Sequence, residues 1–245
     1  MQIKNFLKSC FAVLVLLFIL TGANARQRRV LIFSKTAGFH HQSIPAGIKA
    51  IQKLAAENNF AVDTTTDSTY FTESNLKKYA AVIFLNTTGN VLDDEQQQAF
   101  EQYIKHGGGF VGVHAATDTE YDWPWYGQLV GAYFKSHPKI QQATLEVIDR
   151  NFPGTKNLPA RWTRTDEWYN YKWIDSGLHV LINIDETTYK GGENGAHHPM
   201  CWYHHFDGGR AFYVEMGHTD ASYEEPDYLN LLLSGIEYAM GNNKK

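Results

Sequence analysis

The chain has 245 residues, with 22 basic and 26 acidic side chains and a formal net charge of −4. This length suits one domain with a core of its own. A mildly acidic surface without a basic stripe repels phosphate, so the composition excludes a nucleic-acid partner.

The first 25 residues have the pattern of a secretory signal peptide. Two lysines precede the apolar run 11–20, and small residues follow it up to Ala25. Such signals combine a positive region, an apolar region and a small-residue cleavage site. The run is shorter than the roughly 20 residues of a membrane-spanning helix, and no later run reaches that length. We therefore expect a signal peptide at 1–25, a domain at 26–245, a secreted or periplasmic location and no membrane span after cleavage.

The first half of the domain alternates strand and helix patterns. Short apolar runs at 30–33, 60–62, 81–85 and 110–113 indicate strands. Ser43 precedes a helical repeat of apolar residues and is expected to cap it. Asp93 and Asp94 open a second helix that ends near His106, with Gly107 as its left-handed stop. This alternation predicts a parallel sheet with helices on both faces.

The second half is richer in strands. Apolar runs at 143–148, 180–184, 200–206 and 211–214 indicate strands, and 229–236 indicates a closing helix. Gly208 and Gly209 predict a hairpin turn between the last two strands. The segment 151–173 is aromatic, charged and poor in strand pattern, and long excursions of this kind are often functional. Cys201, the one cysteine after residue 25, is expected to be unpaired and buried.

Histidines follow three of the predicted strands. His41 comes after the first strand, His114 after the fourth and His218 after the last. Ligands of doubly wound sheets bind at the carboxyl ends of the strands, so we expect these three side chains to converge on one site. His106 and His179 are interpreted as structural.

Four motifs appear in a fixed order along the chain. They are Lys35-Thr36-x-Gly38-Phe39-x-His41-x-Ser43-Ile44, the run from Gly107 to Asp118, Asp166-Glu167-Trp168-Tyr169, and a C-terminal group comprising His198-Pro199-x-x-Trp202-x-His204, Gly209-Arg210-x-Phe212-Tyr213 and Gly217-His218-Thr219. Together they resemble the ThuA (trehalose utilization) family. The resemblance implies a three-layer α/β fold of the flavodoxin-like, class I glutamine amidotransferase-like type, mostly parallel with a β-rich C-terminal half. It also implies a role in using trehalose or related glycosides, acting on 3-keto sugars.

The central motif differs from that of glutamine amidotransferases at the position of the nucleophile. Those enzymes carry a nucleophilic cysteine on a sharp turn between a strand and a helix, as α/β-hydrolases carry serine. Here the equivalent turn is Gly112-Val113-His114-Ala115-Ala116, with His114 at the nucleophile position. Because neither cysteine nor serine stands there, glutamine hydrolysis through a thioester is not available. An imidazole at this turn suits a general acid or base, or a metal ligand.

These motifs supply the candidate site residues. We expect His114 and Glu167 to act as an acid–base pair, and His41 and His218 to orient or polarise a carbonyl. The reaction would be hydrolysis, elimination or isomerisation, driven by proton transfer. In the elimination, the carbonyl acidifies the neighbouring C–H bond, so a positioned base would expel the glycosidic substituent. Substrate contacts are expected from Thr36, Thr117, Asp118, Tyr169, Trp202 and His204.

Cofactor and partner expectations follow from what the motifs lack. No G-x-G-x-x-G sequence follows the first strand, so no redox cofactor is expected, and a separate sugar oxidoreductase would supply the keto sugar. The histidines could hold a divalent metal such as zinc, but no compact motif such as H-E-x-x-H identifies one. Two alternatives stay open: a metal-dependent hydrolase of another ester or amide, and a non-catalytic carbohydrate-binding protein that uses the aromatic residues. The sequence leaves open which histidine of each adjacent pair faces the site.

Overall fold

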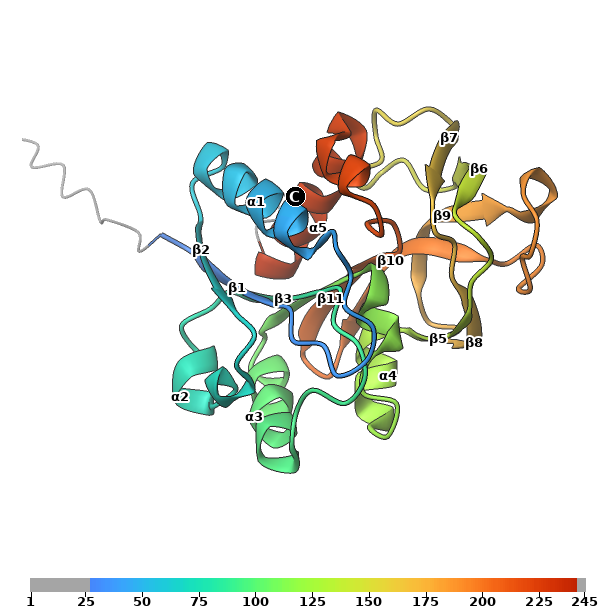
Figure 1. Cartoon of the computed structure of the whole chain (residues 1–245). Coiled ribbons are helices and arrows are strands. Elements are labelled where there is room, and N and C mark those ends of the chain that lie inside the picture. Colours follow the sequence, from blue (N-terminus) through green and yellow to red (C-terminus); the bar gives the residue numbers. More distant parts are fainter. Residues whose placement is uncertain (1–26, 242–245) are drawn as a thin grey trace, which may run out of the picture.

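Nine strands form one sheet in the order β2-β1-β3-β4-β11-β10-β9-β6-β7 (Figure 1). The computed structural model describes residues 27–241, so the expected signal peptide lies outside the described residues. The parallel half contains β1 (Arg29–Phe33), β2 (Ala61–Thr65), β3 (Ala81–Leu85), β4 (Gly109–Val113) and β11 (Gly209–Val214). The antiparallel half contains β6 (Gln141–Val147), β7 (Arg161–Asp166), β9 (His179–Asp185) and β10 (Pro199–Phe206). A separate antiparallel pair joins β5 (Ala132–Ser136) and β8 (Asn170–Ile174).

Helices cover both faces of the parallel half. One face carries α1 (Ile44–Glu57) and α5 (Pro226–Met240), and the other carries α2 (Glu73–Leu76), α3 (Asp94–Lys105) and α4 (Pro124–Val130) (Figure 1). Burial on both faces explains why β3 and β4 are buried along their whole length. The strand order β2-β1-β3-β4-β11 is that of flavodoxin-like sheets. The expected fold class is therefore confirmed, including the β-rich C-terminal half.

The local signals for α3 and for the last hairpin are confirmed. Asp93 caps α3 in a reciprocal capping box with Gln96, and Gly107 is left-handed after the helix. The hairpin between β10 and β11 turns at Asp207 and Gly208, which both have positive φ, one residue earlier than expected.

Ser43 does not act as the expected cap. It stands at the N-cap position of α1, but its side chain makes no capping hydrogen bond. Its hydroxyl instead donates to the carbonyl oxygen of Gly217, 3.0 Å away. The serine therefore ties the start of α1 to the loop that follows β11.

The segment 151–173 has more strand than its sequence indicates. It contains β7 and most of β8. Buried and exposed positions alternate along β7, but two of its three buried residues are Arg164 and Asp166. The expectation of a strand-poor segment was wrong because charged side chains occupy positions that a core-facing strand normally fills with apolar ones.

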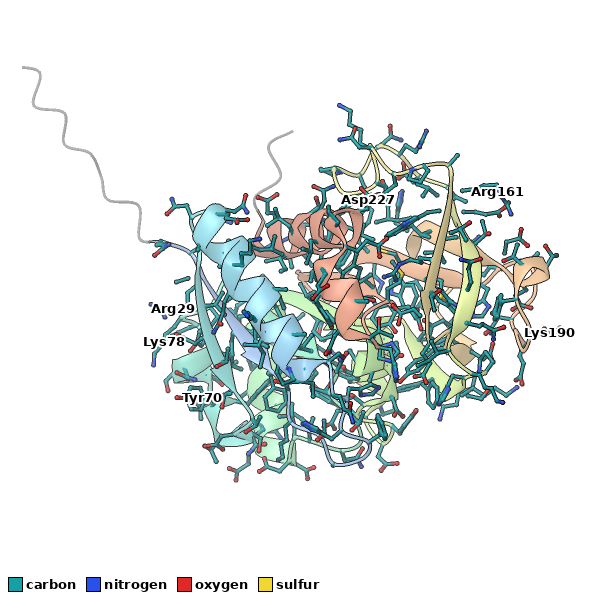
Figure 2. All side chains as sticks on the ribbon, turned by 45° about the horizontal axis from the view of Figure 1, so that its top comes forward. Arg29, Tyr70, Lys78, Arg161, Lys190 and Asp227 are labelled. Carbon is teal, nitrogen blue, oxygen red and sulfur yellow. The ribbon has the colours of Figure 1, made fainter. Side chains whose placement is uncertain are left out.

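The molecular surface is charged at both ends of the sheet. Figure 2 shows Arg29 and Lys78 beside the β2 edge and Arg161 and Lys190 at the far, antiparallel end. Cys201 is buried in β10, as expected. Within residues 27–241, no helix combines the length and apolar character needed to cross a bilayer.

Candidate active site

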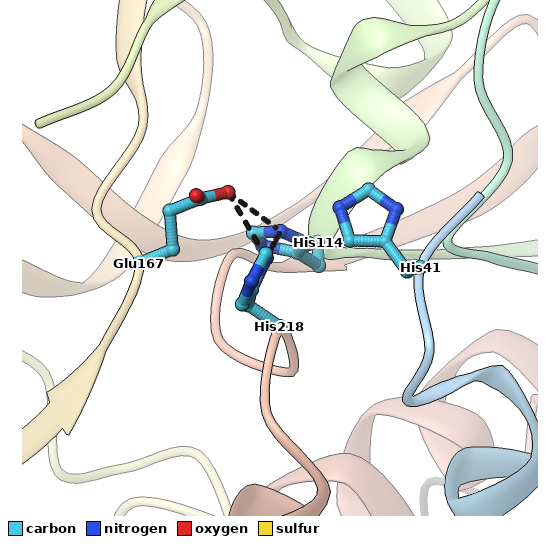
Figure 3. Close-up of side chains that lie close together, drawn as sticks. All are labelled: His41, His114, Glu167 and His218. Atoms are coloured by element: carbon cyan, nitrogen blue, oxygen red, sulfur yellow. Dashed lines mark hydrogen bonds and ion pairs between the residues drawn. The ribbon is translucent and has the colours of Figure 1, made fainter. Parts of the chain in front are cut away.

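Four side chains from distant parts of the chain meet at the carboxyl ends of the parallel strands (Figure 3). His41 lies in the loop after β1, His114 follows β4 directly, and His218 lies in the loop after β11. Glu167 enters from the link between β7 and β8. Each residue offers one nitrogen or oxygen, and these atoms lie within 4.8 Å of one another. We call this group the His–Glu cluster.

His114 occupies a strained turn. It begins the 3₁₀ segment η2 (His114–Asp118), and its φ of 48° lies in the left-handed region. A side chain in that region costs about 1–3 kcal/mol, which the surrounding packing must offset. The neighbouring Gly112 is required, because a Cβ there would lie 2.9 Å from the Tyr213 ring. The sharp turn expected from the sequence is therefore present, with an imidazole where related folds place a nucleophile.

The hydrogen bonds of His114 fix which of its nitrogens faces the cluster. Its Nδ1 lies 2.8 Å from the carbonyl oxygen of Glu215, which can only accept, so Nδ1 carries the hydrogen. When the ring is neutral, Nε2 carries a lone pair, and this atom lies 3.5 Å from Oε2 of Glu167 and 3.3 Å from Nδ1 of His218. The Nδ1 atom of His218 in turn lies 3.0 Å from the same Glu167 oxygen.

Burial and neighbouring charges shift the pKa values of the cluster residues in different directions. Desolvation, followed by the nearby His114 and His218, lowers the pKa of His41 to about 3. Desolvation opposes the charge of Glu167, but its close contacts with His114 and His218 outweigh desolvation and hold the pKa of this carboxyl well below its usual range. Desolvation also disfavours charge on His218, yet the contact with Glu167 raises the pKa of this imidazole. The cluster thus combines a neutral imidazole with a close cation–carboxylate pair.

Asp166 links two of the loops that carry the cluster. Its Oδ1 accepts from the backbone N–H of Glu167, and its Oδ2 accepts from the backbone N–H of Gly217. The same Oδ2 also accepts from Arg164 at 2.9 Å and from the Ser222 hydroxyl at 2.7 Å. Because Gly217 precedes His218, this one buried carboxylate orients two members of the cluster.

Two residues beside the cluster were not among the expected site residues. The half-exposed His137 has its Nδ1 2.9 Å from Oε1 of Glu167, the carboxylate oxygen that the other histidines do not contact. Phe39 is 64% exposed, and its ring meets that of His41 edge to face at 4.8 Å. Phe39 belongs to the first of the four motifs and follows the first strand. The expectation that ligands bind at the carboxyl ends of the strands could therefore have included it. His137 follows β5, which lies outside the main sheet, and no sequence signal marks it.

Three of the expected substrate contacts, Tyr169, Thr117 and Asp118, lie close to His114. The Tyr169 ring is 4.4 Å from that of His114 but is buried, and Thr117 bonds with the hydroxyl of Tyr213 beneath the turn. Asp118 accepts from the Tyr121 hydroxyl, and burial raises its pKa. Thr36 lies in the loop after β1 and bonds with the ring of the exposed His40 rather than with a member of the cluster.

The structure does not bring Trp202 and His204 to the cluster. Trp202 is 1% exposed, stacks on Tyr213 and donates its indole N–H to the carbonyl oxygen of Val130. His204 bonds to the carbonyl oxygen of Leu129. Both residues lie on β10 and support α4, because their side chains point toward that helix rather than toward the ends of the strands.

In two of the adjacent histidine pairs, one residue is buried and the other is exposed. His41 is buried in the cluster, whereas His40 is exposed. His198 is buried behind the site, where its Nε2 lies 2.8 Å from the carbonyl oxygen of Tyr169, and His197 is exposed. A cavity of about 670 Å³ lies elsewhere, at the amino ends of the strands, beside Gly108 and Arg210.

Comparisons with known proteins agree with this architecture. Residues 29–239 match the family model ThuA, described as trehalose utilisation. A ThuA-like protein from Bacteroides uniformis ATCC 8492 has a similar structure, with a TM-score of 0.76 and 27% sequence identity over 91% of this chain and 95% of that chain. A ThuA-like protein from Parabacteroides merdae ATCC 43184 gives a TM-score of 0.72 and 20% identity over 89% of this chain and 91% of that one.

A third solved structure is similar to this chain in fold alone. A β-galactosidase from Bacillus circulans sp. alkalophilus gives a TM-score of 0.59 at 14% identity, over 89% of this chain and 32% of that one. A search among curated proteins gave no match.

Proposed function

The chain belongs to the ThuA family of trehalose utilisation, and on that premise we propose that it is an exported enzyme that processes keto sugars by acid–base chemistry at the His–Glu cluster. The observation that carries the proposal is the convergence of three imidazoles and one carboxylate at the carboxyl ends of the strands. Ligands of this fold class bind at that edge. A purely structural cluster would not need so many ionisable groups in one place.

The geometry supports a role for three of the four groups. The lone pair on Nε2 of His114 suits a general base, because Nδ1 is held by the Glu215 carbonyl. In a keto sugar, this base would take the proton from the carbon next to the carbonyl. The electron pair would then expel the glycosidic oxygen, which would take a proton from His218. Glu167 lies against both imidazoles and stabilises positive charge on either one.

The direct test is turnover of a keto sugar. Purified protein would be incubated with 3-keto-trehalose or a 3-keto-glucoside, and the products followed by mass spectrometry. We expect product with the wild-type protein and with His106→Ala, a control at the exposed end of α3. We expect loss of product with His114→Ala. Saturable sugar binding without product would contradict the proposal and favour a carbohydrate-binding protein.

A metal-dependent hydrolase of another ester or amide is the second candidate function. The observation that favours it is the composition of the cluster, since three histidines and a carboxylate are a common donor set for a catalytic divalent ion. Hydrolysis abolished by a chelator and restored by zinc, with no keto-sugar turnover under the same conditions, would favour this candidate.

A further inference from the structure

We infer that the His–Glu cluster is a preorganised binding site for one divalent metal ion of the zinc class, held by Nε2 of His114, Nδ1 of His218, Oε2 of Glu167 and a ring nitrogen of His41. The inference concerns the same cluster and rests on the second candidate function, the metal-dependent hydrolase, because Nε2 of His114 has no lone pair left to act as a base once it ligates an ion. Its structural basis is independent of the substrate.

The spacing of three ligand atoms matches tetrahedral coordination. Nδ1 of His218 lies 3.0 Å from Oε2 of Glu167 and 3.3 Å from Nε2 of His114, and the third side of this triangle is 3.5 Å. A tetrahedral zinc ion with bonds of about 2.0–2.2 Å holds neighbouring ligand atoms about 3.3–3.5 Å apart. An ion can therefore contact all three atoms after side-chain shifts of a few tenths of an ångström.

His41 supplies the fourth position. Its ring meets those of His114 and His218 edge to face at 4.9 and 5.2 Å, and one of its nitrogens lies within 4.8 Å of the other ligand atoms (Figure 3). The side chain is buried, and its Nδ1 has no hydrogen-bond partner among residues 27–241. A buried imidazole without a full set of partners costs free energy, which a ligated ion would offset.

Neighbouring groups orient the ligands through the ligand atoms that do not face the proposed ion. His114 donates its Nδ1–H to a backbone carbonyl, and Nδ1 of His137 contacts Oε1 of Glu167, the carboxylate oxygen outside the triangle of ligand atoms. Outer partners of this kind fix the tautomer and the orientation of metal ligands. With Nδ1 of His114 protonated, Nε2 of His114 and Oε2 of Glu167 are both acceptors, and the hydrogen on Nδ1 of His218 must serve both. A divalent cation would satisfy all three atoms at once.

The donor set also indicates which ion binds. Imidazole nitrogen favours zinc, cobalt, nickel and copper, whereas magnesium and calcium prefer oxygen ligands. His218 is partly exposed, so a substrate oxygen or a water molecule can reach this side of the site. A bound ion would supply a Lewis acid for the metal-dependent hydrolase, to a substrate oxygen that enters as a fifth ligand.

The test measures metal binding apart from catalysis. Protein stripped with a chelator would be titrated with Co²⁺ and Zn²⁺ by calorimetry, and the visible spectrum of bound Co²⁺ would report four-coordinate geometry. We expect one ion per chain in the wild type and in the His106→Ala control. His218→Ala and Glu167→Gln should each weaken binding by about 100-fold or more, and His137→Ala by about 10- to 100-fold. Circular dichroism would confirm that each variant is folded.

The outcomes separate this inference from the proposed function. Binding without turnover of any keto sugar would support the metal site and contradict the proposed function. Turnover by metal-free protein, with no stoichiometric ion bound, would overturn the metal site and leave the proposed function in place. Binding that is unchanged in both His218→Ala and Glu167→Gln would also overturn the inference.

Discussion

Phe39 presents an exposed aromatic ring beside the His–Glu cluster. Its loop is held in place because the Thr88 hydroxyl donates to the carbonyl oxygen of Phe39 and accepts from the N–H of Gly38. Aromatic rings stack on the apolar faces of sugars, so a rigidly held ring at this position suits a pyranose. We expect Phe39 to form one wall of the substrate site.

Replacing Phe39 tests that role. Phe39→Ala should weaken binding of a keto sugar by about 2- to 10-fold, the range that corresponds to about 0.5–1.5 kcal/mol for an aromatic contact. Phe39→Trp should retain affinity. Tyr70→Ala is the matched control, since Tyr70 is an exposed aromatic residue at the β2 edge (Figure 2). Calorimetric titration measures all three, and equal affinity of Phe39→Ala and the wild type would exclude the stacking role.

Asp166 should matter more for stability than a surface aspartate does. Asp166→Asn removes a buried charge that pairs with Arg164 and orients both Glu167 and Gly217. We expect a loss of about 3 kcal/mol in the free energy of unfolding, measured by urea denaturation. The control Asp185→Asn breaks an ion pair with the half-exposed Arg161 and should cost under about 1 kcal/mol. Equal effects would show that the Asp166 network does not hold the loops.

At the residue scale, the sequence could predict cluster members that obey a rule of the fold. His41, His114 and His218 follow parallel strands, and the carboxyl ends of such strands meet at one edge. His137 follows a strand of the separate pair, for which no such rule exists. Trp202 resembled a site residue only because it belongs to a motif, and its burial depends on packing that residue type does not reveal.

The turn after β4 should show its strain in a comparison of two variants. Both His114→Gly and His114→Ala lose the imidazole, but only alanine keeps a Cβ at a φ of 48°. A left-handed L-residue costs about 1–2 kcal/mol, so the glycine variant should be more stable than the alanine variant by about 1 kcal/mol. Chemical denaturation measures the difference. Greater stability of the alanine variant would mean that the turn relaxes when the imidazole is removed.

At the element scale, apolar periodicity identified most strands and the long helices. It did not identify β7, whose inward positions are Trp162, Arg164 and Asp166. Arg164 can face inward because Glu225, Asp166 and Ser222 all accept its hydrogen bonds. These partners come from a distant segment, so the sequence around β7 cannot show that its charges are satisfied.

At the scale of the whole molecule, alternating strands and helices predicted the parallel half, because each crossover is local in the chain. The pairing of β11 with β4 joins residues about a hundred positions apart, and nothing local specifies it. This pairing nevertheless places His218 beside His114. The expectation that His218 joins the site therefore depended on treating the last predicted strand as part of the parallel sheet, which the pairing of β11 with β4 confirms.

Export is a prediction for the whole molecule. Cleavage after Ala25 should leave a mature chain that begins at Arg26. Intact-mass measurement of the protein recovered from the periplasm or the medium would check this. Recovery of the full-length chain with the cell contents would contradict the predicted location without affecting the site.

The central claim is that the His–Glu cluster moves a proton to and from the carbon next to a sugar carbonyl. Hydrogen exchange in D₂O tests it most directly, because it reports this step even when no bond is broken afterwards. Mass spectrometry should show deuterium entering the keto sugar, or its product, with the wild type and with His106→Ala, and no enzyme-dependent exchange with His114→Ala. Exchange at the wild-type rate in His114→Ala, or its absence in the wild type, would contradict the account.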